Sequence, residues 1–152
     1  MKFTSTHIGA LLSTIAALYN LYEVTTVKAE KHTYNQAINS GTIEIYDNSS
    51  LNNYKSGSKV VCLLIYASWC RYCKKQAPVF EEASSRLPSI TFVRANAELA
   101  DGGKSSVGIA YHEFIEGGYP AIIVFKNGQV VGNRNGFTPI DQLVAFITSS
   151  AL

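Results

Sequence analysis

Cys70 and Cys73, separated by two residues, are the side chains of this sequence best suited to covalent chemistry. A thiolate is the nucleophile in disulfide exchange, and the unpaired N–H groups and dipole of a helix N-terminus favour its formation. We expect Cys70 to lie exposed in the first turn of a helix and to attack. Cys73, one turn deeper on the same side, would resolve the mixed disulfide. The pair itself carries two electrons, so we expect neither an organic cofactor nor a metal.

The residues that follow Cys70 place positive charge near its sulfur. Arg71, Lys74 and Lys75 lower the pKa expected for the thiol below its free value of about 8.5, to the extent that solvent does not screen them. A permanent structural disulfide is an alternative. A three-residue step closes a small loop, however, which suits a labile bond better than a stabilising one.

A zinc site is the other alternative for the cysteine pair. A structural zinc site needs four ligands, and Cys62, His32 and His112 are the candidates left after the first 29 residues. None of them has the spacing of a second ligand pair. Cys62 lies in an apolar run, which favours a small core residue. The sequence therefore indicates redox chemistry rather than a metal site.

The elements that must position the pair follow from hydrophobic patterning. The continuous apolar run Lys59–Tyr66 predicts a strand buried on both faces of a sheet, and Cys70–Leu87 has helical spacing. Asn127-Gly128 between two strand-like runs is a strong hairpin signal. Further strands are predicted at Thr42–Tyr46, Thr91–Asn96, Ala121–Lys126 and Gln129–Asn133, and further helices at Ser49–Lys55, Ser105–Glu116 and Thr138–Ser149.

The helix starts carry their own signals. Asp47 or Asn48 can cap the first of these helices, and Thr138 is expected to cap the last, with Pro139 at its first position. The predicted order is β-α-β-α-β-α-β-β-α. That order indicates an α/β domain with a mixed central sheet and helices on both faces.

The cysteine pair and its landmarks resemble the thioredoxin family. Those landmarks are Trp69, Lys74, Pro78, Gly118-Tyr119-Pro120 before a strand, the hairpin Phe125-Lys126-Asn127-Gly128, and Gly136 before the last helix. The resemblance covers about residues 42–150 and implies a thioredoxin-like fold. It also implies a protein thiol–disulfide oxidoreductase that acts on cysteine-containing proteins and is reset by a separate redox partner protein.

The resemblance assigns roles to three further residues. Pro120 would be a cis-proline beside the two cysteines. It would expose the backbone of Tyr119 for pairing with an extended substrate segment, while Trp69 would cover the edge of the active site. A non-enzymatic binding module, with a groove near Tyr119-Pro120 and residues 96–120, is the alternative from another functional class.

The sequence departs from thioredoxin at three places. Arg71-Tyr72 stands where thioredoxin has Gly-Pro, a dipeptide that tunes the redox potential in that family. Leu64 stands where thioredoxin has a buried aspartate that helps to deprotonate the resolving cysteine, so Cys73 must lose its proton in another way. Residues 96–120 form a longer segment than in thioredoxin, and we expect it to help select partners.

The N-terminus has the layout of a secretory signal peptide over residues 1–29. Lys2 precedes the uncharged, mostly apolar run Ile8–Leu21, and Val27-Lys28-Ala29 offers small residues for cleavage. The run has 14 residues, fewer than the ~20 of a membrane span. We expect a loose lead-in at 30–41, the folded domain at 42–150, and a periplasmic or secreted protein in an oxidising compartment. An uncleaved membrane anchor facing the same side is the alternative.

Composition excludes one class of partner. The chain has 152 residues, 47% of them hydrophobic, and a formal net charge of +2 without a basic block. This balance argues against nucleic acid as a partner. A membrane would be a partner only if the N-terminal segment stays uncleaved.

Overall fold

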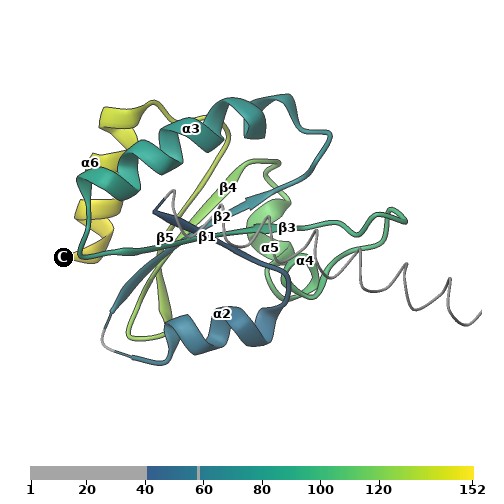
Figure 1. Ribbon diagram of the computed structural model, residues 1–152, viewed down its shortest axis with the longest axis horizontal. Coiled ribbons are helices and arrows are strands. Elements are labelled where there is room, and N and C mark those ends of the chain that lie inside the picture. Colours follow the sequence, from purple (N-terminus) through teal and green to yellow (C-terminus); the bar gives the residue numbers. More distant parts are fainter. Residues whose placement is uncertain (1–40, 58) are drawn as a thin grey trace, which may run out of the picture. The chain divides into compact units, whose positions relative to one another are not determined.

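The computed structural model describes residues 41–57 and 59–152, so the predicted signal peptide and most of the predicted lead-in lie outside the described residues. Within the described part, five strands form one mixed sheet in the order β1-β3-β2-β4-β5 (Figure 1). β1 and β2 run parallel to β3, and β4 runs antiparallel to β2 and β5. The strands are β1 (Thr42–Ile45), β2 (Val60–Tyr66), β3 (Thr91–Asn96), β4 (Ala121–Lys126) and β5 (Gln129–Asn135).

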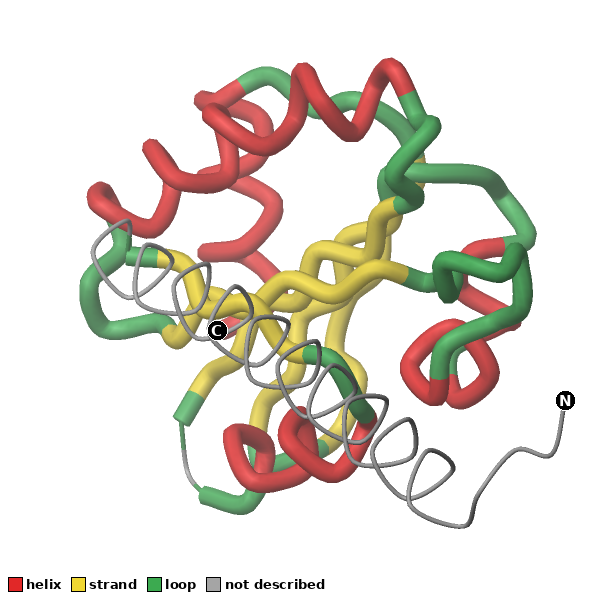
Figure 2. The backbone as a smooth tube through the Cα atoms, turned by 45° about the vertical axis from the view of Figure 1, so that its right-hand side comes forward, coloured by secondary structure: helices red, strands yellow, loops and turns green. Residues whose placement is uncertain are grey.

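Helices cover both faces of this sheet, as predicted (Figures 1 and 2). Alternate side chains of β2 enter two different cores: Leu63 and Ile65 pack on one face, and Cys62 and Leu64 on the other. The helices α2 (Asn48–Lys55), α4 (Ser106–Ala110) and α5 (His112–Ile115) contribute to the first core, and α3 (Arg71–Arg86) and α6 (Ile140–Ala151) to the second. The prediction that β2 is buried on both faces is therefore confirmed.

The predicted helix over 105–116 is wrong in one respect, because it is divided at Tyr111. That residue has φ −120° and ψ 28°, which ends α4 and precedes α5. Tertiary contacts hold it there: its ring meets the edge of Phe125 at 5.7 Å, and its hydroxyl accepts from Lys55 Nζ at 2.7 Å. Packing of one buried aromatic side chain outweighs the helical spacing of its neighbours.

The start of the last helix also differs from the prediction. Pro139, not Thr138, is the N-cap, and it offers no side-chain cap. Thr138 is drawn into the core instead, where its backbone N–H donates to Gln76 Oε1 at 2.7 Å and its carbonyl accepts from Gln76 Nε2 at 3.1 Å. These two hydrogen bonds to Gln76 of α3 replace the capping role expected for Thr138. The predicted cap Asp47 of α2 is confirmed, since its carboxylate accepts from the Ser50 N–H.

The predicted end of the hairpin needs a small correction. β5 runs to Asn135 rather than Asn133, because its pairing with β4 continues until Asn135 lies opposite Ala121. In the part of the chain that the structure describes, no helix has the length and apolar character needed to span a membrane.

Candidate active site

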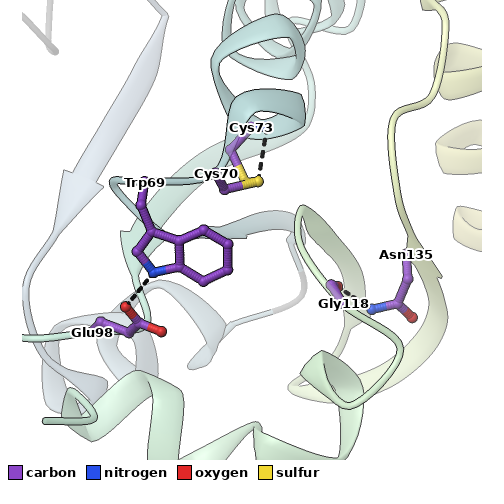
Figure 3. Close-up of a disulfide and its surroundings, with 6 residues drawn as sticks. All are labelled: Trp69, Cys70, Cys73, Glu98, Gly118 and Asn135. Atoms are coloured by element: carbon purple, nitrogen blue, oxygen red, sulfur yellow. Dashed lines mark hydrogen bonds between the residues drawn. A yellow bond between two sulfur atoms is a disulfide. The ribbon is translucent and has the colours of Figure 1, made fainter. Parts of the chain in front are cut away.

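The disulfide lies where the central strand gives way to α3. β2 ends at Tyr66, and Cys70 is the N-cap of α3, held by a bond from its N–H to the Ala67 carbonyl at 3.0 Å. Cys70 and Cys73 form a disulfide with their Cα atoms 5.3 Å apart (Figure 3). Cys70 Sγ also accepts a hydrogen bond from the Cys73 N–H at 3.1 Å. The sulfur thus occupies the position of a helix-capping acceptor, where backbone donors favour negative charge.

The expectation that Cys70 is exposed is wrong for this disulfide state. Cys70 and Cys73 are each 5% exposed, because they form a buried cluster with Ala67 against which Tyr66 and Tyr119 pack. The surface beside the disulfide is therefore partly aromatic.

Trp69 forms the open side of that surface. It is 68% exposed, its Nε1 donates to Glu98 Oε2 at 2.7 Å, and its ring meets Tyr119 edge-on with centroids 5.9 Å apart. Figure 3 shows the indole beside the disulfide, with Glu98 on its far side. Glu98 follows β3 and lies 29 residues along the chain from Trp69, so the motif gave no signal of this contact.

The Tyr119–Pro120 peptide bond is cis, as the resemblance implied. Ala121 lies opposite Ile65 in the register of β4 and β2, which brings Pro120 to the end of the sheet where β2 enters the active-site turn. Gly118, with φ +98°, adopts a conformation that glycine tolerates best.

Asn135 fixes the loop before Pro120. Its Nδ2 donates to the carbonyl oxygens of Phe114 at 2.6 Å and Gly118 at 2.9 Å (Figure 3). The Gly136 N–H donates to the Pro120 carbonyl at 2.8 Å. Sequence reasoning missed Asn135, because it reaches the loop through the pairing of β5 with β4.

A partly open cavity of about 190 Å³ has Cys73 in its wall. It lies between the first turns of α3 and the ends of β2 and β3. Leu64, Ala67 and Ala77 give it apolar walls, while the polar or reactive residues on it are Tyr66, Ser68, Cys73, Lys74 and Arg94.

A buried carboxylate adjoins this cavity. Glu44 on β1 is 6% exposed and accepts from Tyr66 Oη at 2.7 Å and from Arg94 Nε at 2.5 Å. Burial raises the pKa of Glu44 even though both partners favour its charged form. Burial, and then the neighbouring Glu44, raise the pKa of Tyr66. In the sequence, Glu44 looked like an ordinary residue of a short alternating strand.

The residues predicted to tune the pair lie around it on the surface. Arg71, Tyr72 and Lys74 are exposed, and Lys75 Nζ lies 5.8 Å from the centroid of the Tyr72 ring. Lys74 also lines the cavity at Cys73. Their effect on the thiols remains a prediction, weakened by solvent screening of the exposed charges.

Cys62 is fully buried on β2, as predicted for a core residue, and burial raises the pKa of its thiol. It faces the core formed with α3 and α6 and is not in a disulfide. No group of three metal-binding side chains is present among the described residues.

The family model and the curated relatives that match this chain indicate the same family. A family model described as thioredoxin matches residues 25–149. A thioredoxin from Mycoplasmoides gallisepticum is 30% identical over 99 residues, which cover 65% of this chain and 92% of that protein. A putative protein disulfide-isomerase from Schizosaccharomyces pombe is 30% identical over 102 residues, covering 67% of this chain; the chain spans 20% of that protein's length.

Solved structures agree on the fold. A thioredoxin from Malassezia sympodialis has a TM-score of 0.57 and 28% identity, with 71% of this chain and 90% of that chain covered. A mutant thioredoxin from Halobacterium salinarum has a TM-score of 0.62 and 21% identity, with 74% and 93% covered. The thioredoxin-like fold predicted for the domain is therefore confirmed.

Proposed function

Because this chain belongs to the thioredoxin family, we propose that it is a protein thiol–disulfide oxidoreductase whose redox pair is Cys70 and Cys73. The observation that carries the proposal is the Cys70–Cys73 disulfide at the start of α3, with Cys70 Sγ as the helix cap. The Cys73 N–H that donates to Cys70 Sγ in the disulfide is placed to stabilise the thiolate that forms when the bond is reduced.

Exchange proceeds in two steps. The Cys70 thiolate attacks one sulfur of a substrate disulfide; that S–S bond breaks, and the other substrate sulfur leaves as a thiolate and takes up a proton. Cys73 then loses its proton and attacks Cys70 Sγ, which releases the second substrate thiol and forms the Cys70–Cys73 disulfide. The substrate gains two electrons, and the cysteine pair loses two. The same steps in reverse donate a disulfide.

The substrate would lie along the surface beside the disulfide. Trp69 and Tyr119 supply aromatic area there, and the backbone of Tyr119 precedes the cis bond to Pro120. We assign these three residues to the binding of an extended, cysteine-containing segment of a protein substrate. Arg71, Tyr72 and Lys74 border the same turn, and we assign to them the tuning of the pair.

A second protein must return the pair to its starting state after each cycle. The relatives carry the names thioredoxin and protein disulfide-isomerase. The direction of exchange depends on the redox potential of the Cys70–Cys73 pair relative to those of its substrate and its partner protein, so the potential of the pair is the quantity to determine. Equilibration of the pair with glutathione measures it, since ~30 mV corresponds to about 1.4 kcal/mol for a two-electron couple.

We place the activity outside the cytosol, in the periplasm or among secreted proteins. The support is the sequence of residues 1–29, which has the charge and apolar pattern of a signal peptide. Mass spectrometry of the protein from its native host should find an N-terminus at Glu30. An intact Met1 on a membrane-bound protein would indicate an anchor instead.

Substitution of each cysteine tests the reaction. Cys70→Ser should abolish reduction of a model protein disulfide, because the attacking sulfur is gone. Cys73→Ser should accumulate a mixed disulfide with the substrate, detectable on a non-reducing gel, because resolution is blocked. Cys62→Ala is the matched control and should retain activity, since Cys62 faces the core and not the site. Wild-type turnover by Cys70→Ser would overturn the assignment.

A further inference from the structure

The resolving step requires that Cys73 lose a proton, and Cys73 is 5% exposed. Tyr66 and Tyr119 pack against the cluster that Cys73 forms with Ala67 and Cys70. The partly open cavity of about 190 Å³ described above also borders Cys73. A water molecule occupies about 30 Å³ in the liquid, and a site needs polar partners to hold one. This cavity has the volume and, in Tyr66, Lys74 and Arg94, the polar lining to hold water against Cys73.

The cavity connects to a proton acceptor through one side chain. Tyr66 lines it and donates its hydroxyl proton to Glu44 Oε1 at 2.7 Å. The hydroxyl oxygen keeps lone pairs with which it can accept a proton from water while its own proton moves to the carboxylate. Burial raises the pKa of Glu44, which makes its carboxylate a stronger base than an exposed one.

We propose that Glu44 is a positioning residue for the resolving step: acting through Tyr66 and water in the cavity, it receives the proton that Cys73 loses. This proposal rests on the proposed function, because it concerns the second step of the same exchange. It also accounts for how Cys73 can be deprotonated although Leu64, the β2 residue that lines the same cavity, carries no acidic group.

The Cys73 S–H proton passes to water, water passes a proton to Tyr66 Oη, and Tyr66 passes its own to Glu44 Oε1. The Cys73 thiolate attacks Cys70 Sγ, the bond from Cys70 to the substrate sulfur breaks, and the substrate leaves as a thiolate that is protonated from solvent. Glu44 returns its proton through the cavity before the next cycle.

The charged and titratable groups around Glu44 come from three neighbouring elements. Arg94 on β3 holds its second oxygen, Tyr66 at the end of β2 holds the first, and Glu81 on α3 shares Arg94 at 3.7 Å. Tyr46, which directly follows β1, makes the smallest of the electrostatic contributions that raise the pKa of Tyr66. Lys74 and Arg94 line the cavity and favour the Cys73 thiolate once it forms.

The two steps can be timed separately in a stopped-flow experiment. The reduced protein is mixed with a symmetrical aromatic disulfide whose released thiol is coloured. The first release reports attack by Cys70, and the second reports resolution by Cys73. Both are recorded across a range of pH.

Glu44→Gln keeps the size of the side chain and an acceptor for Tyr66 but cannot take up a proton. Its second release should be about a hundredfold slower near neutral pH, the scale of general-base assistance, and should lose its acidic inflection. Tyr66→Phe should slow the same release, because the hydroxyl link is gone. Glu81→Gln is the matched control, because it also removes a carboxylate that pairs with Arg94. Both releases should stay within about twofold of the wild-type rates, far from the roughly hundredfold slowing expected when a general base is lost.

The outcomes separate the two proposals. Absence of the first release in the wild-type protein would overturn the proposed function itself. A normal first release, with the second unchanged in rate and pH profile in both Glu44→Gln and Tyr66→Phe, would overturn the role of Glu44. If Glu44→Gln slows both releases equally, Tyr66→Phe decides: selective slowing of its second release supports the proposal, and its absence refutes it.

Discussion

At the active site, one sulfur both reacts and caps a helix. Serine, threonine, asparagine and aspartate are the usual N-caps, because their side chains accept a hydrogen bond from the first helical turn. Cys70 Sγ accepts from the Cys73 N–H in that position. The Cys73 N–H, which is satisfied by the N-cap at the start of α3, is therefore also the donor that would stabilise the attacking thiolate.

Glu44 shows how one buried residue can couple stability to pH. Its pKa is raised above the ordinary value of 4.5, chiefly by burial, so the folded protein binds this proton more tightly than the unfolded chain does. The contribution of Glu44 to the free energy of unfolding is therefore lost as the pH rises from the pKa that Glu44 has in the unfolded chain through its higher pKa in the folded protein.

Glu44→Gln should remove this contribution. Relative to the wild-type protein, the variant should gain stability as the pH rises from 4 to 7, because glutamine cannot ionise. Urea titrations of both proteins at several pH values measure the difference in unfolding free energy. A difference that is independent of pH, or that changes in the opposite direction, would show that burial is not the dominant influence on Glu44.

At the scale of elements, the segment between β3 and β4 contacts the active-site surface through Glu98, which accepts a hydrogen bond from Trp69. Ser105 Oγ caps α4 by accepting from the Gly108 N–H at 3.1 Å, and it donates to the Asn96 carbonyl at 2.7 Å. The start of α4 is thereby tied to the end of β3. Glu98, which holds Trp69, lies between these two attachment points.

Gly108→Ala should disturb this arrangement. A Cβ at Gly108 would overlap the Ala97 carbonyl oxygen, which is backbone and cannot turn away. We expect a loss of about 1–3 kcal/mol in unfolding free energy, the usual range for overpacking, with altered Trp69 fluorescence because Ala97 adjoins Glu98.

Gly57→Ala is the matched control. No other atom of the described residues lies within 4 Å of a Cβ built at Gly57, so its unfolding free energy should change by less than about 1 kcal/mol. Equal effects of the two substitutions in urea unfolding would mean that the close approach of α4 to residue 97 does not matter.

At the scale of the whole domain, the central sheet separates two cores, and both are needed to hold the active-site turn. α3 starts at the redox pair and packs with α6 over one face through Phe80, Leu143 and Ile147. α2, α4 and α5 cover the other face. Because β2 contributes to both cores, loss of packing on either face weakens the strand that leads into Cys70.

Leu143→Ala should lower the unfolding free energy by about 2–5 kcal/mol, because it leaves a cavity at a fully buried position between α6 and the sheet. Leu152→Ala changes the same residue type where the side chain is 94% exposed, and it should shift the free energy by less than about 0.5 kcal/mol. Denaturant unfolding followed by circular dichroism measures both. A small effect at Leu143 would imply that α6 is not part of the cooperative fold.

The sequence by itself determined the features that depend on short stretches of chain. The apolar run before Cys70 predicted a buried strand, the spacing after it predicted α3, and Asn127-Gly128 predicted the hairpin, whose two residues have φ 53° and 76°. Each depends on patterning or backbone preference within about ten residues. The position of the redox pair at the strand–helix junction followed from these elements.

Tertiary structure decided the contacts that complete the site. Glu44 is 22 residues from Tyr66 and 50 from Arg94, and Trp69 is 29 from Glu98. Gln76 reaches across 62 residues to Thr138 and thereby moves the start of α6. Such partners are selected by strand register and by the need to satisfy buried polar groups, and neither leaves a periodic mark in the sequence.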